Sequence, residues 1–369
     1  MKLIDLNYHP NNECTRPEEI LKKHETSLGY LHFIKQKLKA QVVKHINYEG
    51  TRVADGIEYV FFKRRNNFFQ IPFRTNSWIK KQQPNLVLVQ GTIFPLQVIA
   101  LRMQLGKKVV IALQHHGETP FKGIKKSLQQ LASRFVNAYF FTALDNAAEW
   151  RNQNIIREKQ KCFQLLEAST YLRPRPKKEA KERTGMNGNL NFLWVGRLNA
   201  NKDPLTVLRG FERYLTIHNH ARLYMIYQES DLLAMVESII NKSDLMKQSV
   251  ELKGMMDHNS LTDYYSAADY YLSGSHKEGS GYALIESMAC GCIPVVTNIP
   301  TFRKITADGN LGFLYQPGDA NDLFRVLQNI NPAENENKSH LVLNHFENEL
   351  SFKSISIQLY SHCETLINK

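Results

Sequence analysis

Residues 269–298, DYYLSGSHKEGSGYALIESMACGCIPVVTN, have the pattern of a strand, a loop, a helix and a second strand. Short apolar runs at 270–273 and 293–296 predict buried strands, and 282–289 predicts a helix that ends before Gly291 and Pro294. The loop at 274–281 is rich in Gly and Ser, as is common where a backbone approaches a ligand. The stretch therefore predicts part of a parallel α/β sheet with a binding site at its carboxyl edge.

Two carboxylates flank this loop. Glu278 precedes the predicted helix and Glu286 lies inside it, with seven residues between them. The amide groups of Ser280, Gly281 and Tyr282 are expected to point outward from the helix N-terminus, where an anion is favoured. Because Glu286 lies in the apolar run ALIESMA, an unpaired carboxylate there would be costly, which favours a functional partner.

The order of these residues resembles the nucleotide-sugar signature of retaining glycosyltransferases with the GT-B fold, specifically family 4 (glycosyl transferases group 1). Ser280 differs, because an aromatic residue is usual at that position. The matching residues are Glu278, Gly279, Gly281, Glu286, Met288, Ala289, Cys290, Gly291, Pro294, Val295 and Val296.

A second motif, VGRLNANKDP at 195–204, places Arg197 and Lys202 on a loop between a predicted strand and a predicted helix. A guanidinium fork and an ammonium together suit a diphosphate, and fixed cations stabilise charge that develops on a leaving oxygen. The resemblance implies this role for Arg197 and Lys202. It also implies contacts of Glu278 with the transferred sugar and of Glu286 with the ribose hydroxyls.

The resemblance implies recognition of the base mainly by main-chain groups after the strand at 250–253, and it implies no metal and no other cofactor. The expected donor-binding residues are Gly196, Gly254, Met255, Gly279, Ser280, Gly281, Tyr282 and Glu286.

In the first half, QHHGE at 114–118 follows a predicted strand. Members of the resembled family often have a His in this loop, near the transferred sugar. His116, directly before Gly117, is the first candidate for a catalytic role. His115 is the alternative, and His115 and Glu118 are candidate acceptor-binding residues.

The fold class expected from alternating strands and helices is α/β, with two Rossmann-like domains facing across a cleft (GT-B). We expect an acceptor-binding domain at 1–170, a nucleotide-sugar-binding domain at 171–340, and a C-terminal helix at 341–369 that packs back on the first domain. A single helix is also expected over residues 17–38.

Positive charge is concentrated in the first half. Residues 1–170 contain 26 Lys or Arg against 13 Asp or Glu, including the cluster at 63–65. This charge indicates either an anionic partner, such as a membrane surface, or a solvated basic surface. No nucleic-acid motif accompanies it. The five cysteines lack metal-ligand or disulfide spacing and are expected to be buried free thiols.

The function expected is retaining transfer of a hexosyl unit from a nucleotide diphosphate sugar to a glycan or lipid-linked acceptor, in cell-surface polysaccharide or glycolipid synthesis. The alternatives are a non-catalytic glycosyltransferase-like binding subunit and another GT-B enzyme, such as a nucleotide-sugar epimerase. The absence of a run of 18 apolar residues and of a signal peptide predicts a cytoplasmic protein, with the inner face of the plasma membrane as a further location.

Overall fold

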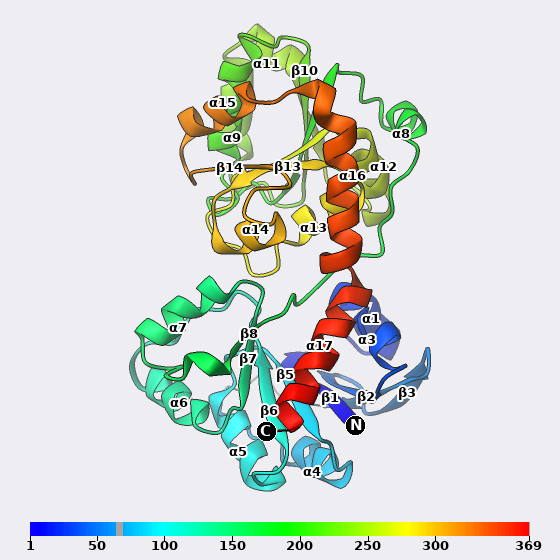
Figure 1. Ribbon diagram of the computed structural model, residues 1–369, viewed down its shortest axis with the longest axis vertical. Coiled ribbons are helices and arrows are strands. Elements are labelled where there is room, and N and C mark those ends of the chain that lie inside the picture. The colour runs from blue at the N-terminus through cyan, green and yellow to red at the C-terminus, as the bar shows by residue number, and fades with distance from the viewer. Residues whose placement is uncertain (64–68, 369) are drawn as a thin grey trace. The chain divides into compact units, whose positions relative to one another are not determined.

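The chain folds into two compact units, each an α/β structure (Figure 1). The computed structural model describes residues 1–63 and 69–368, so Arg64 and Arg65 of the basic cluster lie outside the described part. The first unit comprises Met1–Ser169 and Ser351–Lys369, and the second comprises Thr170–Leu350.

The first unit contains an eight-stranded sheet in the order β3-β4-β2-β1-β5-β6-β7-β8. The pairs are parallel except for β3 with β4. The sequence did not predict β3, because the side chains of this strand are mostly exposed and have no apolar alternation. The strands are β1 (Lys2–Asn11), β2 (Lys39–Ile46), β3 (Gly50–Ala54), β4 (Ile57–Phe62), β5 (Leu86–Gln90), β6 (Val110–Gln114), β7 (Ala138–Phe141) and β8 (Cys162–Gln164).

Helices cover both faces of this sheet, as a parallel sheet requires. An apolar core joins one face to the helices α4 (Phe73–Lys81), α5 (Pro95–Leu105), α6 (Gly123–Ser133) and α7 (Ala148–Asn152). The helix expected over 17–38 is instead three short helices, α1 (Pro17–Lys23), α2 (Glu25–Leu28) and α3 (Leu31–Ile34). The prediction of one helix was wrong because the backbone leaves the helical conformation at His24, the C-cap of α1, with φ of −108° and ψ of 14°. Gly29 is the C-cap of α2.

The second unit contains a six-stranded, fully parallel sheet in the order β11-β10-β9-β12-β13-β14. Its strands are β9 (Leu190–Gly196), β10 (Ala221–Tyr227), β11 (Val250–Gly254), β12 (Tyr270–Ser273), β13 (Ile293–Thr297) and β14 (Phe313–Tyr315). Its helices are α8 (Lys177–Thr184), α9 (Pro204–Leu215), α10 (Leu233–Asn241), α11 (Asp244–Ser249), α12 (His258–Ala267), α13 (Tyr282–Ala289), α14 (Pro300–Ile305), α15 (Ala320–Gln328) and α16 (Asn335–His345).

The C-terminal region is broken in two, although a continuous helix was expected from residue 341. Helix α16 and the π-helical turn Phe346–Leu350 belong to the second unit. Ser351 then caps a new helix, α17 (Phe352–Ile367), by accepting a hydrogen bond from the amide of Ser354. Helix α17 packs on the first unit, where Phe352 lies against Gly29 and His362 against Phe140 of β7. The return of the chain to the first unit therefore begins at Ser351.

Candidate active site

Two loops at the carboxyl edge of the second sheet are joined along their length. Asn201, in the loop between β9 and α9, exchanges hydrogen bonds with the backbone of Lys277 at 3.0 and 3.1 Å. The carbonyl of Asn201 also accepts a hydrogen bond from the amide of His276. A Cβ added to Gly274 would lie 2.7 Å from the carbonyl oxygen of Asp203, so only glycine permits this approach. These contacts bring the two sequence motifs together.

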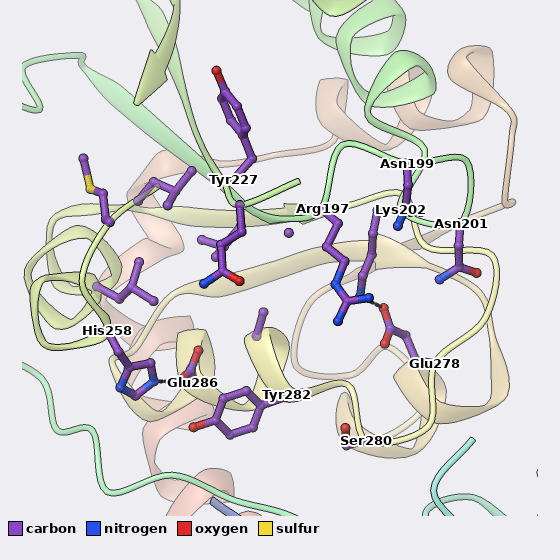
Figure 2. A pocket seen from close by; sticks show the side chains of 17 residues that line it. Arg197, Asn199, Asn201, Lys202, Tyr227, His258, Glu278, Ser280, Tyr282 and Glu286 are labelled. Atoms are coloured by element: carbon purple, nitrogen blue, oxygen red, sulfur yellow. Dashed lines mark hydrogen bonds and ion pairs between the residues drawn. The ribbon is translucent and has the colours of Figure 1, made fainter. Parts of the chain in front are cut away.

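Lys202 and Glu278 form an ion pair at this junction (Figure 2). Their side chains are 25% and 13% exposed, so the pair is accessible but only partly solvated. Arg197 lies beside them, is 62% exposed, and pairs with Glu229 at 3.4 Å between Nε and Oε1. Two cations and one carboxylate predicted from separate motifs are thus neighbours.

Glu286 lines the same pocket as Lys202 and Glu278 but is almost fully buried. Its Oε1 lies 2.5 Å from His258 Nε2, and its Oε2 accepts a hydrogen bond of 3.1 Å from the hydroxyl of Tyr265. Burial and the Glu286 carboxylate raise the pKa of Tyr265 well above its usual value, so this hydroxyl keeps its proton and donates. The carboxylate therefore has protein partners. Its burial therefore no longer favours a ligand partner by itself, and the contact of Glu286 with the ribose stays a prediction.

A pocket of about 470 Å³ connects these groups (Figure 2). Arg197, Lys202 and Glu278 lie at one end, and His258 and Glu286 at the other. Of the donor-binding residues expected from the sequence, Gly196, Ser280, Tyr282 and Glu286 line the pocket. Gly254, Met255, Gly279 and Gly281 do not line it, and the side chain of Met255 is 75% exposed.

Gly281 lies between Ser280 and Tyr282, which line the pocket. It caps α13 in the left-handed region with φ of 65°, and an added Cβ would lie 2.7 Å from Ile305 Cδ1. The left-handed backbone favours glycine here, and a larger residue would also displace the end of the Ile305 side chain. The amides that follow lie at the N-terminus of α13, where the helix dipole favours an anion.

The sequence did not identify several residues that line the pocket. Tyr227 ends β10 and Gln228 follows it. His258 begins α12, and its ring lies parallel to that of Tyr282, with the ring centroids 6.4 Å apart. Their positions at or after the carboxyl ends of parallel strands indicate a binding site, because these strand ends meet at one edge of the sheet. The pairing of His258 with Glu286 has no such signal, since 28 residues separate them.

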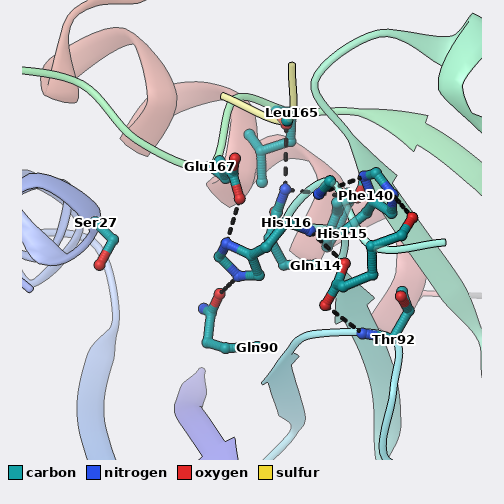
Figure 3. A network of polar contacts seen from close by, with 12 residues as sticks. Ser27, Gln90, Thr92, Gln114, His115, His116, Phe140, Leu165 and Glu167 are labelled. Carbon is teal, nitrogen blue, oxygen red and sulfur yellow. Dashed lines mark hydrogen bonds and ion pairs between the residues drawn. The ribbon is translucent and has the colours of Figure 1, made fainter. Parts of the chain in front are cut away.

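The QHHGE loop lies at the carboxyl edge of the first sheet (Figure 3). His116 Nδ1 forms an ion pair with Glu167, and His116 Nε2 lies 2.8 Å from Gln90 Oε1. The sequence identified neither Gln90 nor Glu167.

His115 is buried against Phe141 and Trp150. Its Nε2 lies 3.0 Å from the carbonyl of Glu118, and its Nδ1 accepts from the amide of Gly117, so both ring nitrogens bind the loop itself. Burial lowers the pKa of His115. This side chain holds the loop, and the acceptor role expected for it stays a prediction.

Glu118 is also used by the loop. Its two carboxylate oxygens accept hydrogen bonds from the amides of Thr92 at 3.1 Å and His116 at 2.6 Å. The structure therefore gives Glu118 a role in loop conformation, and the acceptor role expected for it stays a prediction.

All five cysteines are free; four are buried and Cys162 is half-buried. Among residues 1–63 and 69–368, no cluster of three or more His, Cys, Asp or Glu side chains could hold a metal ion. No helix within those ranges is long and apolar enough to cross a membrane.

Comparisons with known proteins identify the second unit. Residues 176–339 match the family model "Glycosyl transferases group 1". No curated protein matches the chain in sequence.

The fold matches solved structures over their full length. The sucrose-phosphate synthase of Thermosynechococcus elongatus is 14% identical, with a TM-score of 0.71 and complete coverage of both chains. A glycosyltransferase from Rickettsia africae is 12% identical with a TM-score of 0.73, covering 100% of this chain and 99% of that one. Anabaena HepE in complex with UDP and glucose is 12% identical with a TM-score of 0.69, covering 99% of this chain and 100% of that one.

Proposed function

From the premise that this protein is a glycosyltransferase, with a group 1 domain at residues 176–339 and the GT-B fold, we propose that it transfers a hexosyl unit from a nucleotide diphosphate sugar, with retention of configuration, to a glycan or lipid-linked acceptor. The observation that carries the proposal is the pocket in which Arg197, Lys202 and Glu278 converge at the N-terminus of α13.

In this proposal the diphosphate lies at the cationic end of the pocket. A doubly charged leaving group competes with Glu278 for Lys202, and Arg197 adds a planar fork of donors. The amides at the start of α13 supply further donors aimed at the same place. Charge that develops on the leaving oxygen during transfer is stabilised by groups already in position.

Glu278 then binds hydroxyls of the sugar, since a carboxylate accepts from two neighbouring donors. Glu286 contacts the ribose while His258 and Tyr265 hold its orientation. The leaving phosphate takes the acceptor proton, so no carboxylate is required as a nucleophile and the two-carboxylate scheme of glycosidases does not apply. The reaction is expected to need no metal.

The acceptor is assigned to the first unit, with lipid-linked acceptors favoured by its surface. On α6, Ile124 is 80% exposed between the exposed residues Lys122 and Lys125. An exposed apolar side chain among cations suits an anionic lipid surface. Co-sedimentation with vesicles of phosphatidylglycerol but not of phosphatidylcholine, weakened by salt and by Lys125→Glu, is the expected result. If the protein binds neither kind of vesicle, the basic surface is solvated and has no lipid partner.

A thermal-shift panel of UDP-, GDP- and ADP-sugars tests the donor assignment. The correct donor binds the folded state and raises the melting temperature by mass action. We expect Arg197→Ala to weaken this shift in melting temperature and to lower turnover about 10- to 100-fold, because the substitution removes a charged hydrogen bond. Arg209→Ala, an exposed arginine on α9, is the matched control and should behave as wild type.

Release of nucleoside diphosphate with and without acceptor separates the alternatives. Acceptor-dependent release supports transfer, and an epimerised donor without transfer would indicate the epimerase. No stabilisation by any nucleoside diphosphate would support a non-catalytic subunit. Proton NMR of the product's anomeric centre tests retention.

A further inference from the structure

A series of hydrogen bonds in the first unit runs from Asp5 through Gln90 to His116. Because Asp5 can only accept, it determines which group donates in each bond. Asp5 is fully buried on β1, and its Oδ2 accepts from the Tyr30 hydroxyl at 2.7 Å. Burial and the Asp5 carboxylate raise the pKa of Tyr30 well above its usual value, so Tyr30 keeps its proton and donates. The same Oδ2 lies 2.5 Å from Nε2 of Gln90. A carboxylate only accepts, so Gln90 must present its NH₂ group to Asp5.

This orientation of Gln90 determines what His116 must donate. With its NH₂ group on Asp5, Gln90 presents only its carbonyl oxygen to His116 Nε2, at 2.8 Å (Figure 3). A carbonyl oxygen has no hydrogen to give, so Nε2 of His116 carries a proton. Asp5 thus fixes the protonation of a ring that it does not touch.

The second ring nitrogen faces a carboxylate. His116 Nδ1 forms an ion pair with Glu167, whose side chain is 5% exposed. Both ring nitrogens therefore act as donors, and a histidine with two N–H groups is a cation. Burial by itself lowers the pKa of His116, but Glu167 and Glu118 outweigh burial and raise it above the usual value.

The other charged groups around His116 do not cancel this effect. Lys44, buried on β2, lowers the pKa of His116. His24 is neutral at ordinary pH because burial and Lys44 lower its pKa to about 3. Burial also lowers the pKa of His115, so His115 does not compete as a cation.

We propose that Gln90 and Glu167 are positioning residues that hold His116 as a fixed imidazolium. Its side chain then acts on a substrate through its positive charge, which favours a phosphate or other anionic group at this edge of the first sheet, and it cannot serve as a base. The inference rests on the proposed transfer reaction for its catalytic meaning, but the charge state stands without that reaction.

The direct test is NMR of the ring nitrogens of ¹⁵N-histidine-labelled protein, with His116→Asn to assign the His116 signals. Wild-type protein should show both His116 nitrogens protonated at neutral pH. Glu167→Gln keeps an acceptor for Nδ1–H but removes the charge, and should lower the midpoint of the His116 titration by about one to three pH units. Glu158→Gln, which removes an exposed carboxylate before β8, should leave the titration unchanged.

A neutral His116 in wild-type protein at pH 7 would overturn the proposal, as would an unchanged titration in Glu167→Gln. If Glu167→Gln does not fold, Gln90→Met removes the carbonyl acceptor instead and should also lower the midpoint. Because the titration uses no substrate, its outcome is independent of whether transfer occurs. With a transfer assay in hand, the alkaline limb of the kcat profile should move to lower pH in Glu167→Gln.

Discussion

The two units use charge at the carboxyl edges of their sheets in opposite ways. In the second unit, Lys202 and Glu278 line a pocket of about 470 Å³ beside Arg197, which is 62% exposed. In the first unit, both ring nitrogens of His116 are engaged by protein groups, and Glu167 is 5% exposed. The two ion pairs are similarly exposed, at 25% and 13% for Lys202 and Glu278 and at 33% and 5% for His116 and Glu167. A pair that lines a pocket can exchange a partner for a ligand, whereas a ring held at both nitrogens keeps its charge state.

The number of protein contacts explains the difference. Water weakens the attraction between Lys202 and Glu278, so an incoming diphosphate loses little by replacing one contact with another. The His116 ring is instead held at both nitrogens, and breaking its contact with Glu167, whose side chain is 5% exposed, would leave that carboxylate unpaired. The first arrangement suits binding and release, and the second suits a charge that stays constant through a reaction.

The largest expected effect comes from removing the exchangeable cation. Lys202→Ala should lower turnover about 100- to 1,000-fold, because one fixed cation at the leaving phosphate is lost. The melting temperature should change little, since the pair is partly solvated. Steady-state kinetics and thermal unfolding measure the two effects.

The control is Lys242→Ala, which removes an exposed lysine of the second unit. Wild-type turnover in Lys202→Ala would refute the phosphate assignment. A loss of turnover explained by unfolding would show that the Lys202–Glu278 pair is structural.

A smaller effect is expected at the other end of the pocket. Glu286→Gln removes the charge but keeps an oxygen that can accept from Tyr265. Donor binding should weaken about tenfold, because a charged hydrogen bond becomes a neutral one. Isothermal titration with the donor found by thermal shift measures the change.

Glu251→Gln, which removes the carboxylate paired with Lys253 on β11, should bind donor as wild type does. Equal donor affinity in Glu286→Gln would mean that this carboxylate serves only to join α13 to His258 and Tyr265.

The smallest effect concerns stability and pH in the first unit. The raised pKa of His116 means that the folded state binds its proton more tightly than the unfolded state does. That stabilisation is fully present below the ordinary histidine value of 6.5 and is lost as pH rises through the folded-state value. Glu167→Gln should therefore melt a few degrees below wild type near pH 6, and the gap should narrow at alkaline pH. Melting curves at several pH values check this, and a gap that widens with pH would contradict it.

Much of the fold could be predicted because its signals are local. Apolar runs such as 270–273 and 293–296 predicted strands that the structure contains, with β13 one residue longer. The resemblance to group 1 glycosyltransferases and the GT-B fold is confirmed. Both could be predicted because they depend on motifs that are contiguous in the chain. The break of the helix over 17–38 was not predicted, because the packing of Gly29 against Phe352 depends on residues far apart in sequence.

The sequence by itself determined which residues could bind a diphosphate, since their chemistry and their places at strand ends are properties of short segments. Only the tertiary structure decided how those residues are paired. Lys202 meets Glu278 across 76 residues, and His116 meets Glu167 at the end of another strand. Hydrogen-bond direction and burial arise when distant segments pack together, so a sequence pattern that lists donors and acceptors cannot say which of them remain for a ligand.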